Sequence, residues 1–149
     1  MKRIISYIII MILLVSAPRV SASYRANYSD LKLSDGDRSL IARAVASEGR
    51  GRCCLVKTCI AAVICNRLLC DMLPDDVGRI AWDGAVFPRA EQYEPTDDEM
   101  YEASTVLSLV LEHGIDPTCG ALFIMEKGDV DADLFTVTLE LEGLIFAKP

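Results

Sequence analysis

The feature that most constrains the fold is an apolar segment in the first half of the chain. Residues 53–70 read CCLVKTCIAAVICNRLLC, with no glycine or proline to interrupt a helix. The segment is apolar nearly all round rather than along one stripe, which is typical of a helix buried on most of its sides. It therefore predicts a domain wrapped around a central helix, with Asn66 and Arg67 as the polar pair near its far end.

Helix start signals and a period-two pattern place the other elements. Capping boxes predict a helix over 35–48 and another from Thr96 to a stop at Gly114, with a short helical turn over 75–81 between them. The segment DPTCGALFIM indicates a turn into a short strand. Residues 135–143 then alternate as a strand whose inward side chains are Phe135, Val137, Leu139 and Leu141. The fold class is therefore α+β, mainly helical, with a small C-terminal β-hairpin.

The N-terminal 22 residues have the pattern of a signal peptide. Two basic residues precede the apolar run 4–15, and small residues end the segment at Ala22. An apolar run this short does not span a bilayer. We therefore expect cleavage after Ala22, export to a periplasm, a cell wall or the medium, and no stable membrane insertion afterwards. The mature chain, 23–149, is expected to form one domain.

The charge balance excludes some partners and singles out one acidic residue. The full chain has a net charge of −7, and the signal segment holds basic residues but no acidic ones, so the mature chain is more acidic still. This balance argues against binding to nucleic acid and to anionic membranes. Residues 38–67 are the exception, because there six basic residues accompany a single acid, Glu48.

The six cysteines of an exported chain favour disulfides, and we expect one or two bridges, one of them involving Cys119. Their spacing lacks the CxxC pairs of a zinc site, and Cys65 is most simply a small buried apolar residue. A calcium-loop spacing of acids at 129, 131, 133 and 140 has Leu134 where glycine is required. We therefore expect no metal and no cofactor.

Glu48 stands out because it completes an apolar stripe at the C-terminal end of its helix. The stripe consists of Leu40, Ile41, Ala44 and Val45. Burial and the negative end of the helix dipole both raise the pKa of a carboxyl group, as a general acid near neutral pH requires. The alternative is a structural glutamate held ionised in an ion pair with Arg43 or Arg52.

The order of short motifs resembles a known family. LIARAVASEGRG, IAAVICNR, LP, AVF, DPTCGALF and a final Gly143 and Phe146 follow one another as in the SleB-like cell wall hydrolases, which include spore-cortex-lytic enzymes. The resemblance implies a lysozyme-like, lytic-transglycosylase-related fold. It also implies cleavage of peptidoglycan glycan strands between N-acetylmuramic acid and N-acetylglucosamine.

The resemblance also implies functional residues. Glu48 corresponds to the catalytic glutamate, Asn66 is expected to face the cleft, and Phe87 and Thr118 match residues near it. For Asn66 the alternative is a core amide that binds nearby backbone. With peptidoglycan as the implied substrate, the basic residues around Glu48, Arg50 among them, are placed to receive its lactyl and stem-peptide carboxylates. Tyr93 is a further candidate, since it belongs to a turn-rich aromatic loop of the kind that lines sites.

These observations favour an exported lytic transglycosylase or muramidase with peptidoglycan as its substrate. Glu48 would protonate the leaving oxygen, and the muramoyl 6-hydroxyl would then close an anhydro ring. If water attacks instead, a second carboxylate about 5–9.5 Å away is needed, for which Asp83, Glu91 and Glu94 are candidates. The altered loops, among them segment 124–126, and the extra cysteines keep a second hypothesis open, a catalytically silent relative that binds wall glycan or a partner protein. A partner protein for wall targeting also fits the active enzyme.

Overall fold

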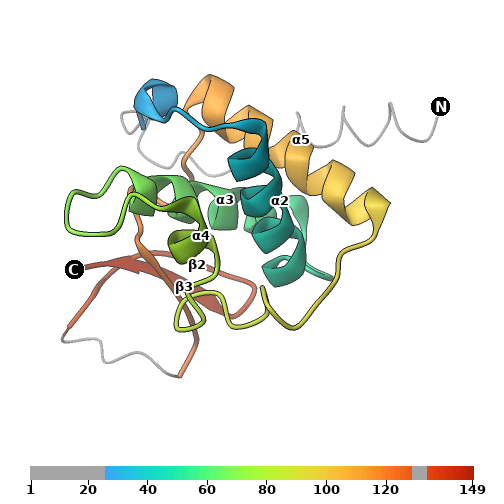
Figure 1. The fold of residues 1–149 in the computed structure, drawn as a ribbon. Helices are drawn as coiled ribbons and strands as arrows, with labels where there is room; N and C mark the ends of the chain where they lie inside the picture. The colour runs from blue at the N-terminus through green and yellow to red at the C-terminus, as the bar shows by residue number, and fades with distance from the viewer. Residues whose placement is uncertain (1–25, 129–133) are drawn as a thin grey trace.

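The computed structural model describes residues 26–128 and 134–149, and its fold is mostly helical with one small antiparallel sheet (Figure 1). The elements are η1 (Tyr28–Asp30), α2 (Asp35–Glu48), α3 (Cys54–Leu68), α4 (Val77–Ala81), α5 (Asp97–His113), β1 (Phe123–Glu126), β2 (Thr136–Leu141) and β3 (Leu144–Lys148). This architecture confirms the expected α+β class. The signal segment 1–22 and the acids at 129, 131 and 133 lie outside the described residues.

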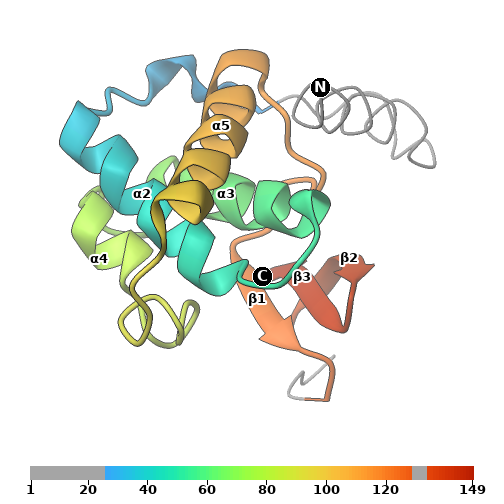
Figure 2. The same ribbon diagram turned by 90° about the vertical axis from the view of Figure 1, so that its right-hand side faces the viewer.

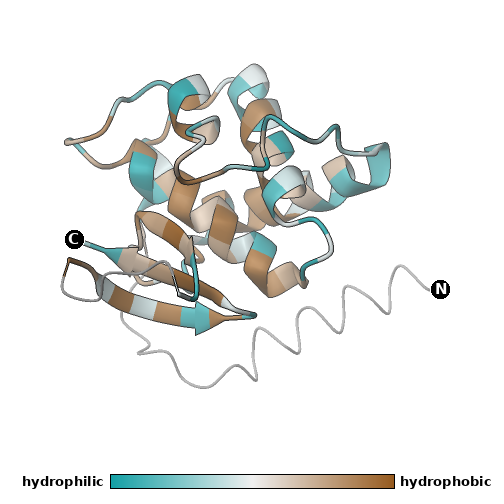
Figure 3. Ribbon diagram, turned by 90° about the horizontal axis from the view of Figure 1, so that it is seen from below, coloured by the Kyte–Doolittle hydropathy of each residue, from teal (hydrophilic) through white to brown (hydrophobic). Residues whose placement is uncertain are grey.

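Helix α3 is the central element, as its all-round apolar sequence predicts. Every residue from Val56 to Arg67 is buried. Helices α2, α4 and α5 and strand β1 all pack against α3, and Figure 2 shows the sheet on the side of α3 that the C-terminal end of α2 approaches. Figure 3 shows apolar residues concentrated on the central helix and the strands, with hydrophilic residues on the outer loops.

The helix boundaries follow the local capping signals. Both predicted capping boxes are present, with Ser34 opening α2 and Thr96 opening α5. Helix α5 ends at Gly114, which has a φ of +62° and lies so close to the backbone of Ala26 that a β-carbon would not fit. One prediction within α2 is wrong. Leu40 lies at the outer edge of the stripe and is 37 % exposed, because the apolar face narrows toward the start of the helix.

The sheet has the order β1-β3-β2, so the last strand lies in the middle and is the most buried of the three. The strict alternation predicted for 135–143 is wrong at Val137, which is 42 % exposed. A register shift between Val137 and Leu139 causes the difference, because a bulge turns the residues on one side of it relative to the other. Phe146 of β3 is fully buried and anchors the sheet to the helices.

The expected disulfides are absent, since all six cysteines, each within the described residues, are free thiols. Cys59 and Cys65 are fully buried within α3, where they pack as small apolar side chains. Burial raises the pKa of Cys65 to about 12, so this thiol stays protonated and unreactive. Across residues 26–128 and 134–149, no helix is both long and apolar enough to cross a membrane.

Candidate active site

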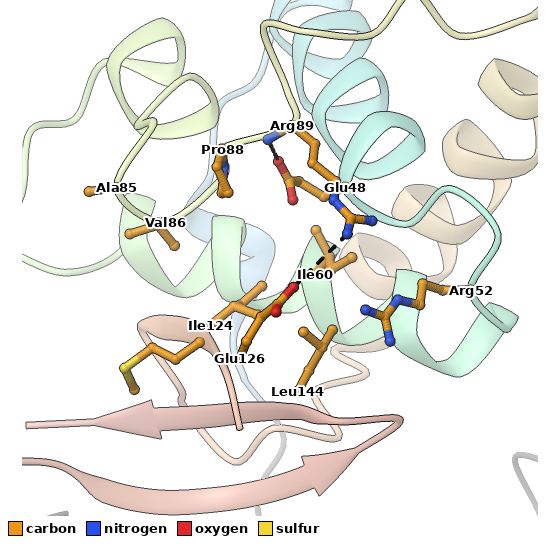
Figure 4. A pocket seen from close by; sticks show the side chains of 11 residues that line it. Glu48, Arg52, Ile60, Ala85, Val86, Pro88, Arg89, Ile124, Glu126 and Leu144 are labelled. Carbon is orange, nitrogen blue, oxygen red and sulfur yellow. Dashed lines mark hydrogen bonds and ion pairs between the residues drawn. The ribbon is translucent and has the colours of Figure 1, made fainter. Parts of the chain in front are cut away.

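A pocket of about 320 Å³ opens between the helices and the sheet, and Glu48 is one of the residues that line it (Figure 4). The residues come from the end of α2 and the following loop, from α3, from the loop after α4, and from β1 and β3. They are Glu48, Arg52, Ile60, Ala85, Val86, Pro88, Arg89, Ile124, Met125, Glu126 and Leu144. The pocket is therefore an apolar depression that carries two carboxylates and two guanidinium groups.

Glu48 is held at the pocket by the packing of its own helix. Ile41 and Val45 are fully buried on the inner face of α2, so the last residue of the helix is directed toward α3 and the sheet. Gly49 follows directly, and a β-carbon there would lie 2.6 Å from the Lys57 side chain. This close approach fixes the end of α2 against α3 and leaves the Glu48 carboxylate half-buried.

The surroundings of Glu48 favour its protonated form. Burial raises the pKa of Glu48 above its ordinary value of 4.5, while the backbone N–H groups of Arg89 and Ala90 and the charge of Arg89 oppose the shift. The Arg89 N–H donates a hydrogen bond to Oε1 of Glu48, which orients the carboxyl group. A carboxyl group that keeps its proton at higher pH and faces an open pocket is suited to general acid catalysis.

The neighbouring arginines do not neutralise Glu48. Arg43 pairs with Glu94 instead, and Nη1 of Arg52 donates to the backbone carbonyl of Glu142 at 2.6 Å. Within the described part of the chain, no ion pair involves Glu48. The structural ion pair that was the alternative for Glu48 is therefore not present.

Asn66 and Thr118 lie in a buried hydrogen-bond network and do not line the pocket. Asn66 accepts a hydrogen bond from the Tyr28 hydroxyl at 2.8 Å and donates to Asp116 at 3.0 Å and to the carbonyl of Ala121 at 3.1 Å. Thr118 is fully buried and donates its hydroxyl to Asp116 at 2.5 Å. Asn66 is therefore a core amide, which was the alternative to its expected position facing the cleft.

Phe87, Arg50 and Tyr93 also lie outside the pocket lining. Phe87 is only 1 % exposed, and its burial holds the loop whose next two residues, Pro88 and Arg89, form the wall. The guanidinium of Arg50 stacks on the ring of Tyr93, 3.7 Å from its centroid. These two side chains form a pair outside the pocket lining, where Arg50 also lies 3.8 Å from Glu99.

The second carboxylate of the pocket is one that the sequence did not indicate. Asp83 binds Arg67 at 2.6 Å, and neither Glu91 nor Glu94 lines the pocket. Glu126, at the end of β1, does line it. The only signal for Glu126 was that segment 124–126 departs from the motif order of the family, and Arg89 had no local signal.

Comparison with known proteins identifies the fold. No protein-family model and no curated protein matches the chain. Among solved structures, the catalytic domain of the Bacillus cereus SleB protein matches with a TM-score of 0.67 and 24% identity, over 85% of this chain and 100% of that one. The catalytic domain of the germination-specific lytic transglycosylase SleB from Bacillus anthracis matches with a TM-score of 0.65 and 23% identity, over 78% and 98%.

The chain therefore has the lysozyme-like fold of the SleB catalytic domain, and the resemblance predicted from its motifs is confirmed at the level of fold. Among the described residues, no group of three or more His, Cys, Asp or Glu side chains is arranged to hold a metal ion.

Proposed function

We propose that this chain is an exported enzyme that cleaves the glycan strand of peptidoglycan, with Glu48 as general acid and base. The observation that carries the proposal is the half-buried carboxyl group of Glu48 on an open pocket, with its pKa raised and no ion pair among the described residues. The SleB fold supports a lytic transglycosylase-type activity. Export by the signal segment 1–22 is part of the same proposal.

The proposed reaction begins with proton transfer from Glu48 to the glycosidic oxygen between N-acetylmuramic acid and N-acetylglucosamine. The bond from this oxygen to the anomeric carbon breaks, and an oxocarbenium-like centre forms. The Glu48 carboxylate then removes the proton of the muramoyl 6-hydroxyl, whose oxygen closes the 1,6-anhydro ring. Glu48 regains its proton in this step, so one carboxyl group is sufficient and no cofactor is required.

Hydrolysis is the competing outcome at the same site, because the pocket holds a second carboxylate. In a muramidase Glu126 would activate water or stabilise the positive charge, as a paired carboxylate does in glycosidases. Its carboxylate lies 4.0 Å from the guanidinium of Arg89, as the dashed line in Figure 4 marks. We favour the transglycosylase route, since Glu126 has this partner while the proposed ring closure needs only Glu48.

The test is digestion of purified sacculi, with the soluble products analysed by mass spectrometry. We expect muropeptides that end in 1,6-anhydro-muramic acid, whereas reducing ends would establish a muramidase. Glu48→Gln should release neither product. Sedimentation of the wild-type protein with sacculi without any release would favour the catalytically silent glycan-binding relative, and release by Glu48→Gln at the wild-type rate would exclude the role of Glu48.

A further inference from the structure

The pocket contains one positive charge without a carboxylate partner. Its two acidic residues, Glu48 and Glu126, both lie next to Arg89, which hydrogen-bonds the first through its backbone and pairs with the second through its guanidinium (Figure 4). Arg52 is the other cation of the lining, and no carboxylate of the described residues forms an ion pair with it.

The side chain of Arg52 is held in place. Its Nη1 donates to the carbonyl of Glu142 at 2.6 Å, and Figure 4 shows the guanidinium directed into the pocket on the side of Leu144. Glu142 and Gly143, with φ values of +50° and +79°, form the tight turn between β2 and β3, a geometry that fixes the direction of this carbonyl. The hydrogen bond therefore joins two loops and orients the remaining N–H donors of Arg52.

We infer that Arg52 is a specificity-determining residue that binds a carboxylate carried by the muramoyl unit of the glycan. An oriented guanidinium with free donors matches the geometry of a carboxylate and discriminates it from a neutral group. The inference rests on the proposed function, from which it takes the glycan. It adds that the pocket selects an acidic strand over a neutral one of the same sugar backbone.

Two groups of peptidoglycan supply this chemistry. In glycan without peptides the lactyl ether of N-acetylmuramic acid ends in a free carboxylate. In glycan with peptides the lactyl group is an amide, and the carboxylates belong to the stem. The negative charge of Glu126 lies 4.0 Å from the guanidinium of Arg89 and repels a further carboxylate there. Arg52 has no acidic partner among the described residues, so it is the better placed of the two arginines to bind either group.

The test is binding of three ligands to the purified protein carrying Glu48→Gln, which leaves the glycan intact during calorimetric titration. The ligands are a tetrasaccharide of alternating N-acetylglucosamine and N-acetylmuramic acid, its lactyl methyl ester, and the same glycan with stem peptides. We expect the free acid or the peptide form to bind about tenfold more tightly than the ester. Adding Arg52→Gln should remove this preference, whereas Arg79→Gln, an exposed arginine outside the pocket, should not change it.

The pattern identifies the source of the carboxylate. Preference for the free acid assigns the lactyl group, and preference for the peptide form alone assigns the stem. Equal affinity for all three ligands, or a preference that survives Arg52→Gln, would overturn the inference. A wild-type chain that binds with this preference but never cleaves sacculi would instead contradict the proposed enzyme and leave the Arg52 assignment intact.

Discussion

Two polar sites on the same helical scaffold differ in how far their hydrogen bonds are satisfied. At the end of α2, the carboxyl group of Glu48 has the backbone N–H groups of Arg89 and Ala90 on one side and lines the pocket with the other. Near the end of α3, the amide of Asn66 is 8 % exposed and is bound on all sides by Tyr28, Asp116 and backbone. Both residues were candidate site residues, yet only Glu48 lies where a ligand can reach it.

The difference shows that the burial of a polar side chain does not by itself indicate a catalytic role. A buried group with all its partners stabilises the fold, since leaving any partner unpaired costs free energy. A half-buried acid with an open side retains the capacity to exchange a proton with a ligand. Mutations should therefore separate the two sites, with activity lost at one and stability lost at the other.

The largest effect is expected for Glu48→Gln. We expect the rate of muropeptide release to fall by roughly 10²–10⁴-fold, because the general acid is removed. The amide oxygen still accepts the Arg89 N–H, so the melting temperature should not fall. Rate assays and thermal melts of the same preparation check both parts, and a variant that unfolds instead would mean that Glu48 is structural.

Asp116→Ala should have the largest effect on stability. Asp116 accepts hydrogen bonds from Asn66, from the backbone and hydroxyl of Thr118, and from the backbone of Gly120. Its removal leaves these donors unpaired in the core, and we expect a loss of about 3 kcal/mol in the free energy of unfolding. Urea denaturation measures this loss, with the exposed Asp71→Ala as a control expected within about 0.5 kcal/mol of wild type. A neutral Asp116→Ala would contradict the structural assignment.

Gly49→Ala should moderately reduce both the stability and the rate of muropeptide release, because Gly49 packs against α3 and directly follows Glu48. The new β-carbon would meet Lys57 and the carbonyl of Val45 at 2.6 and 2.7 Å, which forces the end of α2 away from α3. We expect a loss of about 1–3 kcal/mol of stability and a lower rate per folded molecule, because Glu48 moves. Gly51→Ala is the matched control, since nothing lies within 4 Å of its added carbon and only its positive φ adds strain.

The smallest effect is the dependence of stability on pH. Burial raises the pKa of Glu48 above 4.5, so between the unfolded and folded pKa values the native state binds more protons. Its contribution to stability is therefore present at low pH and lost as the pH rises. The stability of Glu48→Gln relative to wild type should increase over that window, measured by urea denaturation at several pH values.

A second carboxylate gives the opposite sign and serves as its control. The N–H of Thr96 and the hydroxyl of Tyr93 hold the pKa of Glu99 below its usual value, so its contribution is present at higher pH and lost as the pH falls. Glu99→Gln should therefore lose stability relative to wild type as the pH rises. If the stability difference between Glu48→Gln and wild type does not change with pH, the carboxyl group of Glu48 in the wild-type protein is not desolvated.

The sequence predicted those parts of the fold that depend on local signals. The boundaries of α2 and α5 follow from capping boxes, and the central position of α3 follows from its all-round apolarity. The central place of β3 and the register shift after Val137 were not predictable, because they depend on pairing with strands elsewhere.

The site followed the same rule. The position of Glu48 on the pocket was predictable because this residue occupies the last position of an apolar stripe on its own helix. The positions of Arg89 and Glu126 were not predictable, because only the fold brings them to Glu48. Arg89 lies 41 residues further along the chain, and Glu126 lies at the end of β1. Asn66 shows the converse, a motif residue whose buried partners are visible only in the structure.

The most direct test measures muropeptide release per folded molecule for Glu48→Gln and Asp116→Ala side by side, at a temperature low enough to keep part of the second variant folded. The account predicts a fully folded but inactive Glu48→Gln. It also predicts an Asp116→Ala whose activity, divided by its folded fraction, equals that of wild type. Full activity in Glu48→Gln would contradict the account, as would an inactive but folded Asp116→Ala.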